Sequence, residues 1–423
     1  GIPAMGGARM NNATQDVIVI GGGMVGGTVA SLLGRSGFSV TLVDSGPAPD
    51  WDPSASVGLR VSALSPGSAR ILDAAGAWGR IEAERHCPYR RMHVEDGQGS
   101  GTVDFEAGSF GLERLGTITE NQLVVHALWE ALLSNDKVRC LNGVGLVDVQ
   151  QDSGAVHCEL DDGQQLAGRL LLACDGANSA VRRLTGIDGE SWEYNQLGLV
   201  GLVRKQQPNP GVAWQRFLAG GPLALLPLAD GWSTMVWSLP AAEARRLQQC
   251  DDDAFQEQLE AATNGWLGSV EGVGPRATFP LSMNLSDRYL AGRVVLLGDA
   301  AHVVHPLAGQ GVNLGLADAA ALLECLLQER NNRDIYQPGA LQEWERWRRS
   351  ETALMARGVD ALGKLFQPQV LALPRALGMG LVGRSFARRF CNAPRARGPM
   401  PRNWLWATAL QRYVHATWRR VNS

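Results

Sequence analysis

Several features that would assign a chain to a special class of protein are missing from this 423-residue sequence. It has no run of about 18 apolar residues, so no membrane-spanning helix is indicated, and no low-complexity tract, so global disorder is excluded. The seven cysteines are scattered and include no Cys-x-x-Cys pair, which favours a reducing cytoplasm and gives neither a disulfide framework nor a zinc site. No secretory signal opens the chain, and we interpret residues 1–9 as a cloning remnant.

Acidic residues are missing from the end of the chain. Residues 361–423 contain one lysine and ten arginines without any Asp or Glu, so this segment carries +11, and the net charge of −3 leaves −14 on residues 1–360. Hydrophobic residues recur at helical spacing between residues 403 and 421, with polar and basic residues between them. This basic amphipathic segment is expected either to dock on an anionic membrane or a protein partner, or to pack on the acidic body. Nucleic acid is not an expected partner.

Glycine, by contrast, is abundant, with 51 residues, as in chains that bring their backbone close to a ligand. The β-branched run 16–20 predicts a buried strand, and Gly21-x-Gly23-x-x-Gly26 follows it directly. A helix is predicted over 24–36 and a second strand over 39–43, which ends at Asp44. This βαβ unit predicts a dinucleotide site, with a pyrophosphate at the helix N-terminus and a ribose on Asp44; the alternative is an incidental glycine turn.

A second glycine repeat, Gly378-x-Gly380-x-x-Gly383, has the same spacing but not the same context. No apolar strand precedes it and no acid follows it. We therefore interpret it as a small-residue helix face or a turn, and we predict one dinucleotide fold.

Two further predicted strands end in a carboxylate. Strand 169–174 leads into Asp175-Gly176-x-x-Ser179-x-x-Arg182, and strand 293–297 leads into Gly298-Asp299, a glycine-rich loop and an Ala/Leu-rich helix over 312–328. Carboxyl ends of parallel strands form the ligand-binding edge of an α/β sheet. The alternative for the first motif is an Asp-Gly turn with a helix N-cap at Ser179.

Two histidines in the glycine-rich loop raise the question of a metal site. His302 and His305 are three residues apart, but Pro306 interrupts the helix they would need, and no third ligand converges in the sequence. We predict that they serve loop packing and that the chain has no metal.

Together these motifs resemble the FAD-dependent aromatic-ring monooxygenases of the para-hydroxybenzoate hydroxylase type, and among them the ubiquinone-biosynthesis hydroxylases. The similarity covers about residues 15–365 and includes the stretches 59–64, 119–121, 225–228 and 236–239. It implies an α/β fold in which a Rossmann-like FAD-binding domain carries an inserted antiparallel-sheet substrate domain, which the strand-like texture of residues 190–280 supports, and C-terminal helices. The implied limits are 10–80, 110–185 and 280–335 for the FAD-binding domain, 81–109 and 186–279 for the substrate domain, and 336–423 for the basic helical region.

The resemblance implies a role for each matching position. Residues that would bind the phosphates and adenosine of FAD are Gly21, Gly23, Met24, Val25, Gly26, Asp44, Ser45 and Arg60. Residues that would bind its flavin and ribityl parts are Asn121, Gln122, Asp175, Gly176, Asp299, Gly309, Gln310 and Asn313, of which Asp175 and Gly176 would also meet NAD(P)H. Residues that would lie next to the reacting ring are Pro306, Gly311 and Val312, the last two at the start of a helix.

The chemistry implied by the resemblance is ring hydroxylation. NAD(P)H reduces FAD, reduced flavin and O2 form a C4a-hydroperoxide, and the distal oxygen is transferred to an electron-rich phenol. The expected substrate is a hydrophobic prenylated phenol of ubiquinone biosynthesis; the alternatives are another aromatic metabolite, or a FAD-binding scaffold subunit of a quinone-biosynthesis assembly. Tyr194, His157 and Glu193 are candidate bases for the phenol, but a structural role is the preferred interpretation of each. The expected location is the cytoplasm, with peripheral attachment to the inner membrane if the basic segment docks there.

Overall fold

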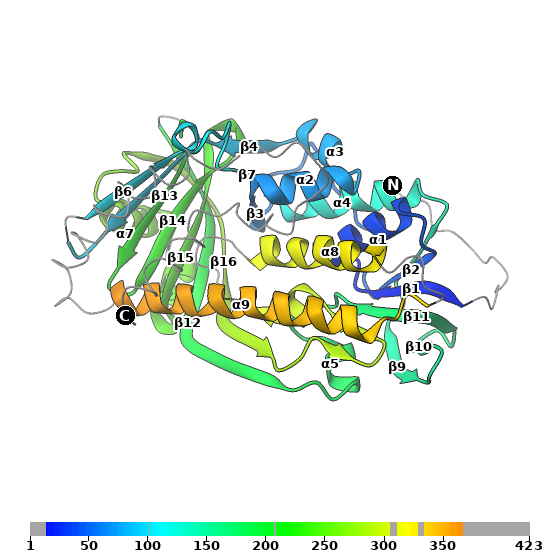
Figure 1. Cartoon of the computed structure of the whole chain (residues 1–423). Helices are drawn as coiled ribbons and strands as arrows, with labels where there is room; N and C mark the ends of the chain where they lie inside the picture. The colour runs from blue at the N-terminus through cyan, green and yellow to red at the C-terminus, as the bar shows by residue number, and fades with distance from the viewer. Residues whose placement is uncertain (1–13, 100, 207–208, 305–310, 329–333, 367–423) are drawn as a thin grey trace.

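The computed structural model describes residues 14–366, apart from residue 100 and residues 207–208, 305–310 and 329–333. Within this part of the chain, two eight-stranded sheets and one three-stranded sheet form the frame. The first sheet and its helices lie at one end of the molecule, and the second sheet lies at the other (Figure 1). The three-stranded sheet lies between them, above helix α8 (Gly311–Gln328). Helix α9 (Pro338–Phe366) runs below α8 along the molecule (Figure 1).

The first sheet contains the predicted parallel strands. Its path is β17 (Leu290–Ala291), β18 (Val294–Leu296), β11 (Gln165–Ala173), β1 (Gln15–Ile20), β2 (Val40–Asp44) and β8 (Val138–Asn142), and the hairpin β9 (Leu146–Gln151) and β10 (Val156–Leu160) joins it at β11. The strands from β18 to β8 are parallel. The β-branched runs of β1, β2 and β18 are buried on both faces, as expected for a parallel sheet covered by helices, whereas the edge strand β8 is partly exposed.

Helices cover this sheet. Those that pack on it are α1 (Met24–Arg35), α4 (Asn121–Leu133), α5 (Ala180–Leu184) and α8, while α2 (Pro66–Ala74) and α3 (Trp78–Glu82) pack on α1, α4 and α8. The predicted helices 24–36 and 312–328 are confirmed, and α1 ends one residue before the predicted position, ahead of Gly37 with its left-handed φ of 89°. By length and composition α8 could cross a membrane, but 56% of it is buried in the protein, as in a core helix.

A small sheet links the two large ones. It consists of β3 (Val61–Leu64), β7 (Gly116–Glu120) and β4 (His86–Tyr89), all antiparallel. Ala63 and Ile118 of this sheet pack against Leu202 and Leu226 of the second large sheet. This apolar contact joins the parallel-sheet end to the other end of the molecule.

The second large sheet is the expected antiparallel one, with a single exception. Its order is β19 (His302–Val303), β16 (Val270–Ser286), β12 (Gly189–Lys205), β15 (Trp232–Pro240), β14 (Gly221–Pro227), β13 (Val212–Leu218), β5 (Arg91–Asp96) and β6 (Thr102–Glu106). Strands β5 and β13 pair in parallel. A hairpin imposes antiparallel pairing, but these two strands come from distant parts of the chain.

One face of this sheet is closed by helices α6 (Ala241–Gln249) and α7 (Asp252–Thr263). Leu199, Met235 and Trp237 of the sheet form a core with Phe255 and Leu259 of α7. Side chains alternate along a strand, so the residues between them face the other way, toward the three-stranded sheet.

The short 3₁₀ helices are η1 (Ala107–Phe110), η2 (Ala229–Gly231) and η3 (Gly298–Ala300). Strand β16 continues past residue 279, and the domain limits stay a prediction.

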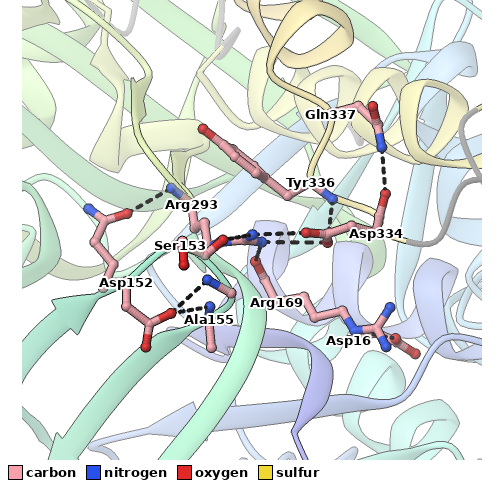
Figure 2. A network of polar contacts seen from close by, with 11 residues as sticks. Asp16, Asp152, Ser153, Ala155, Arg169, Arg293, Asp334, Tyr336 and Gln337 are labelled. Atoms are coloured by element: carbon pink, nitrogen blue, oxygen red, sulfur yellow. Dashed lines mark hydrogen bonds and ion pairs between the residues drawn. The ribbon is translucent and has the colours of Figure 1, made fainter.

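A buried arginine organises the amino end of strand β18 (Figure 2). Arg293 donates to the backbone oxygens of Ser153 (2.5 Å) and Arg169 (3.0 Å) and forms an ion pair with Asp334 at 2.8 Å. Its guanidinium also lies 4.4 Å from the Tyr336 ring centroid. The Arg293–Asp334 pair therefore fastens the segment that leads into α9 to the edge of the sheet away from the strands' carboxyl ends.

Candidate active site

The glycines of the turn after β1 have different structural roles. Gly21 has φ of 98°, and a Cβ there would lie 2.3 Å from the Cys174 oxygen; a Cβ on Gly26 would lie 1.8 Å from the Gly21 oxygen. Both are required by packing. A Cβ on Gly23, however, would meet no described atom within 4 Å. The turn is therefore closed on its inner side and open at Gly23, beside the N-terminus of α1, which fits the pyrophosphate of FAD.

Asp44, at the end of β2, lies against this turn. Its carboxylate accepts the backbone N–H groups of Gly22 (2.5 Å) and Gly46 (2.8 Å). Each oxygen keeps a second lone pair, so a ribose hydroxyl can still be bound. Ser45, the next residue, is exposed. The indole of Trp129 on α4 donates to the Gly22 oxygen at 2.8 Å and so supports the turn. Nothing in the sequence pattern around Trp129 indicates this role.

Asp175 follows β11 at the same edge of the sheet. One oxygen accepts the backbone N–H groups of Ala180 (2.7 Å) and Val181 (3.1 Å) at the start of α5. The other oxygen, Oδ1, is buried and has no partner among the described residues. The alternative prediction, a helix N-cap at Ser179, is also confirmed, because the Ser179 hydroxyl accepts the N–H of Arg182 at 2.9 Å. The cap leaves Asp175 Oδ1 available, so an orphaned acceptor remains for a ligand.

Asp299 follows β18, after Gly298 with its left-handed φ of 57°. Its side chain is open to solvent at the carboxyl edge of the sheet, but the surrounding protein raises the pKa of its carboxyl group by desolvation, and His302 and Arg60 oppose this rise. Arg60 is exposed and close enough for its positive charge to act on the pKa of Asp299. A cation and an anion thus face the same site, as a cofactor with phosphate and polyol parts requires.

Arg182 ties two of the predicted cofactor loops together. Its guanidinium donates to the Ala300 oxygen at 2.8 Å and to the Ala177 oxygen at 2.7 Å. Arg182 therefore links the loop after β11, with Gly176 at φ of 81°, to the turn after β18.

Two asparagines that were predicted to bind FAD, Asn313 and Asn121, have side chains that are hydrogen-bonded within the protein. The Asn313 amide accepts from Ser65 N (2.9 Å) and Ser68 Oγ (2.6 Å) and donates to the Ala63 oxygen (2.9 Å). The Asn121 oxygen accepts from Ser62 Oγ at 2.7 Å. Each asparagine thus also fixes the segment it contacts, and its role toward FAD stays a prediction. Gln122 beside Asn121 is exposed.

The N-terminus of α8 points toward the second sheet, since its other end leads into α9 (Figure 1). Gly311 and Val312 form this terminus, whose free N–H groups favour negative charge. Met24 and Val25 of α1 lie nearby, with Val25 packed against Gly298 and Gly315. The predicted residues Pro306, Gly309 and Gln310 lie outside the described residues, as does His305. The roles of all these positions toward FAD stay predictions.

A buried cluster of charged side chains lies directly behind the Asp299 turn. Asp318 of α8 contacts His302 Nε2 and Arg348 Nε of α9, each at 2.6 Å, and all three side chains are 0% exposed. Desolvation alone would raise the pKa of Asp318, but His302 and Arg348 outweigh it and lower the pKa to about 2. The described residues hold no group of three or more His, Cys, Asp or Glu suited to a metal. The Ala/Leu-rich run 312–328 contains two acids, Asp318 and Glu324, and an acid inside such a run was the available signal for this cluster.

The candidate bases lie in different surroundings. His157 is exposed on β10 and hydrogen-bonded with Asp152 at 3.0 Å, in the hairpin that flanks the first sheet. Glu193 is exposed on β12, and Tyr194 beside it lies 3.8 Å from the sulfur of Met283. These contacts favour structural roles.

The structure thus brings a glycine-rich turn and three carboxylates to one edge of a parallel sheet, with a second sheet joined in front of that edge. This is the arrangement of a dinucleotide-binding domain with a second sheet next to its ligand-binding edge. The chain belongs to the FAD binding domain family, whose model matches residues 14–334.

Individual relatives support this assignment. The chain is 32% identical over 374 residues to the 3-demethoxyubiquinol 3-hydroxylase of Escherichia coli (strain K12), covering 88% of this chain and 95% of that protein. It is 35% identical over 372 residues to ubiquinone hydroxylase UbiL of Rhodospirillum rubrum, covering 87% and 86%. The crystal structure of pqsL, a probable FAD-dependent monooxygenase from Pseudomonas aeruginosa, matches with a TM-score of 0.73 at 25% identity, covering 87% of this chain and 100% of that one. The resemblance to FAD-dependent monooxygenases is confirmed, and FAD is the cofactor.

Proposed function

We propose that this monooxygenase hydroxylates the ring of a prenylated phenol on the route to ubiquinone, with NAD(P)H and O2 as co-substrates. The observation that carries the proposal is the face of the second sheet opposite α6 and α7. Val200, Ala224, Leu226 and Val236 alternate with the residues that pack on those helices and are half-buried. Val236 pairs with both Val200 and Ala224 across the sheet, so three adjacent strands present apolar side chains on one face.

The residues of this chain act by binding, orienting and excluding water. Bound FAD supplies the redox chemistry that activates O2. The open turn at Gly23 and the carboxylates at the strand ends would hold it, and the N-terminus of α8 would favour negative charge on its ring system. The apolar sheet face would keep water from the reacting atoms and accept a ring with a hydrophobic tail.

The test is NAD(P)H-dependent oxygen uptake by the purified FAD-loaded protein, with products identified by mass spectrometry. A short-chain prenylated phenol should be hydroxylated on the ring, and the same phenol without its prenyl group should react far more slowly. Val236→Asp should raise KM for the prenylated phenol about tenfold or more, because a carboxylate would lie against the apolar tail. Val147→Asp, at an exposed position of β9, is the matched control and should leave KM unchanged. Equal turnover of both phenols would favour another aromatic substrate, and absence of oxygen uptake with any phenol would favour a scaffold role.

We further propose that the basic segment 361–423 brings the enzyme to a membrane surface. Residues 367–423 of this segment lie outside the described residues, but the segment's charge of +11 contrasts with −14 on the rest of the chain. A prenylated phenol dissolves in the bilayer, so attachment to anionic lipid would give the enzyme access to it.

Removal of residues 399–423 is expected to weaken co-sedimentation with anionic liposomes while FAD stays bound. Four arginines are lost, each contributing about 1 kcal/mol near an anionic surface. Neutral liposomes and high salt are the controls, since both remove the electrostatic attraction. Equal sedimentation of both proteins, or none by either at low salt, would favour packing of the segment on the acidic body.

A further inference from the structure

Helix α9 lies outside the dinucleotide-binding unit but is fixed firmly against it. It runs below α8 along the molecule (Figure 1). Trp344 belongs to the core of the first sheet, and the Glu345 carboxylate accepts the backbone N–H groups of Tyr289 (2.5 Å) and Leu290 (3.2 Å). One turn after Trp344, Arg348 enters the interior with a fully buried side chain. The inner face of α9 is therefore part of the protein core.

Arg348 meets a carboxylate that holds three segments at once. One oxygen of Asp318 takes the Nε–H of Arg348 at 2.6 Å. The other contacts His302 Nε2 at 2.6 Å and accepts the backbone N–H of Gly298 at 3.1 Å. Asp318 thereby joins α9, strand β19 and the turn after β18. Without the arginine, its first oxygen would be left buried without a donor, so the carboxylate would have to turn or take up a proton.

The turn held in this way carries Asp299, the carboxylate that faces the FAD site. Gly298 has a left-handed φ, and a Cβ there would lie 3.0 Å from Val25, so the turn has little freedom on its α1 side. On the other side the Ala300 oxygen accepts from Arg182. The Asp318 carboxylate supplies the partner for the Gly298 N–H and thus completes the support of the turn.

We infer that Arg348 is a positioning residue for FAD: through Asp318 it sets the Gly298–Asp299 turn, so the affinity of the site depends on a helix outside the dinucleotide fold. The inference rests on FAD binding alone and not on the proposed substrate. A loss of flavin affinity and a loss of substrate turnover are therefore separate results.

The experiment compares two buried arginines that are each paired with an aspartate. Arg348→Met removes the partner of Asp318, and Arg293→Met removes the partner of Asp334 at the amino end of β18 (Figure 2). Arg346→Met, at an exposed position of α9, controls for charge. The Kd for FAD is measured by flavin fluorescence on apoprotein well below its Tm, and Tm is measured on the same samples. Both buried substitutions should lower Tm, but only Arg348→Met should raise the Kd, by about tenfold or more.

A general loss of stability would give a different pattern. If Arg348→Met binds FAD as tightly as the wild type, or if Arg293→Met raises the Kd as much, the inference is overturned. Should either methionine variant fail to fold, Arg348→Lys and Arg293→Lys replace them, because lysine keeps the charge but not the directed Nε–H. Arg348→Lys should then raise the Kd more than Arg293→Lys, and equal values would overturn the inference.

Discussion

Replacement of Gly23 by valine is expected to abolish FAD binding while the protein stays folded. A Cβ at this position meets no described atom within 4 Å, so the side chain fits the protein itself. It would instead occupy the place where the pyrophosphate approaches the N-terminus of α1. Loss of those charge-assisted hydrogen bonds should cost about 3 kcal/mol or more, a change of more than about 100-fold in Kd. Flavin content after purification, together with circular dichroism and Tm of the apoprotein, measures both halves of the prediction.

Two other glycines provide the controls. Gly26→Val should prevent folding, because its Cβ would lie 1.8 Å from the Gly21 oxygen. Gly380→Val, in the second glycine repeat outside the described residues, should retain FAD. A yellow, fully loaded Gly23→Val protein would show that the first repeat is not the phosphate site.

Asp318→Asn is expected to produce the largest loss of stability at a position away from the glycine-rich turn. The substitution leaves the Arg348 guanidinium buried and without a counter-charge, which costs about 3–5 kcal/mol. In a cooperative unit of this size, that corresponds to a fall of about 5 °C in the Tm of the apoprotein. Glu324→Gln is the matched control on the same helix, since Glu324 is half-buried and makes no ion pair with the described residues.

The same pair predicts a pH effect of defined sign. The titratable and charged groups around Asp318 are His302, Arg348, Tyr289 and Cys174, and the first two lower its pKa from 3.8 to about 2. Because the folded-state pKa lies below the unfolded value, the carboxylate contributes stability above about pH 4 and loses it as the pH falls toward 2. The difference in stability between wild type and Asp318→Asn should therefore shrink by about 1 kcal/mol between about pH 5 and about pH 3. A difference that stays constant over this range would contradict the assigned charge state of Asp318.

Local sequence was sufficient for the dinucleotide-binding unit. Its strand, glycine-rich turn, helix and second strand follow one another within about 30 residues, and the ladder of β1 and β2 has the predicted pairing. The rule that parallel strands present their carboxyl ends at one edge is sufficient to predict that Asp44, Asp175 and Asp299 lie together. Family resemblance added the identity of the cofactor, which hydrogen-bonding geometry alone does not specify.

Other features had no local signal. Trp129 supports the Gly22 oxygen across 107 positions of the chain, and Asn313 turns its amide to the segment 63–68 across about 250. The parallel pairing of β5 with β13 likewise joins strands that no turn connects. Such contacts depend on which elements are packed side by side, and periodicity reports only the apolar face of each element.

The sequence by itself therefore determined the βαβ unit, the strands that lead into Asp175 and Asp299, and the sheet edge at which these carboxylates meet, because these follow from short-range periodicity, glycine geometry and strand direction. Only the tertiary structure decided how that edge is supported. The pairing of Asp318 with His302 and Arg348 required α8, α9 and β19 to meet in the core, where a buried charge must find its partners among whatever side chains the fold brings within reach.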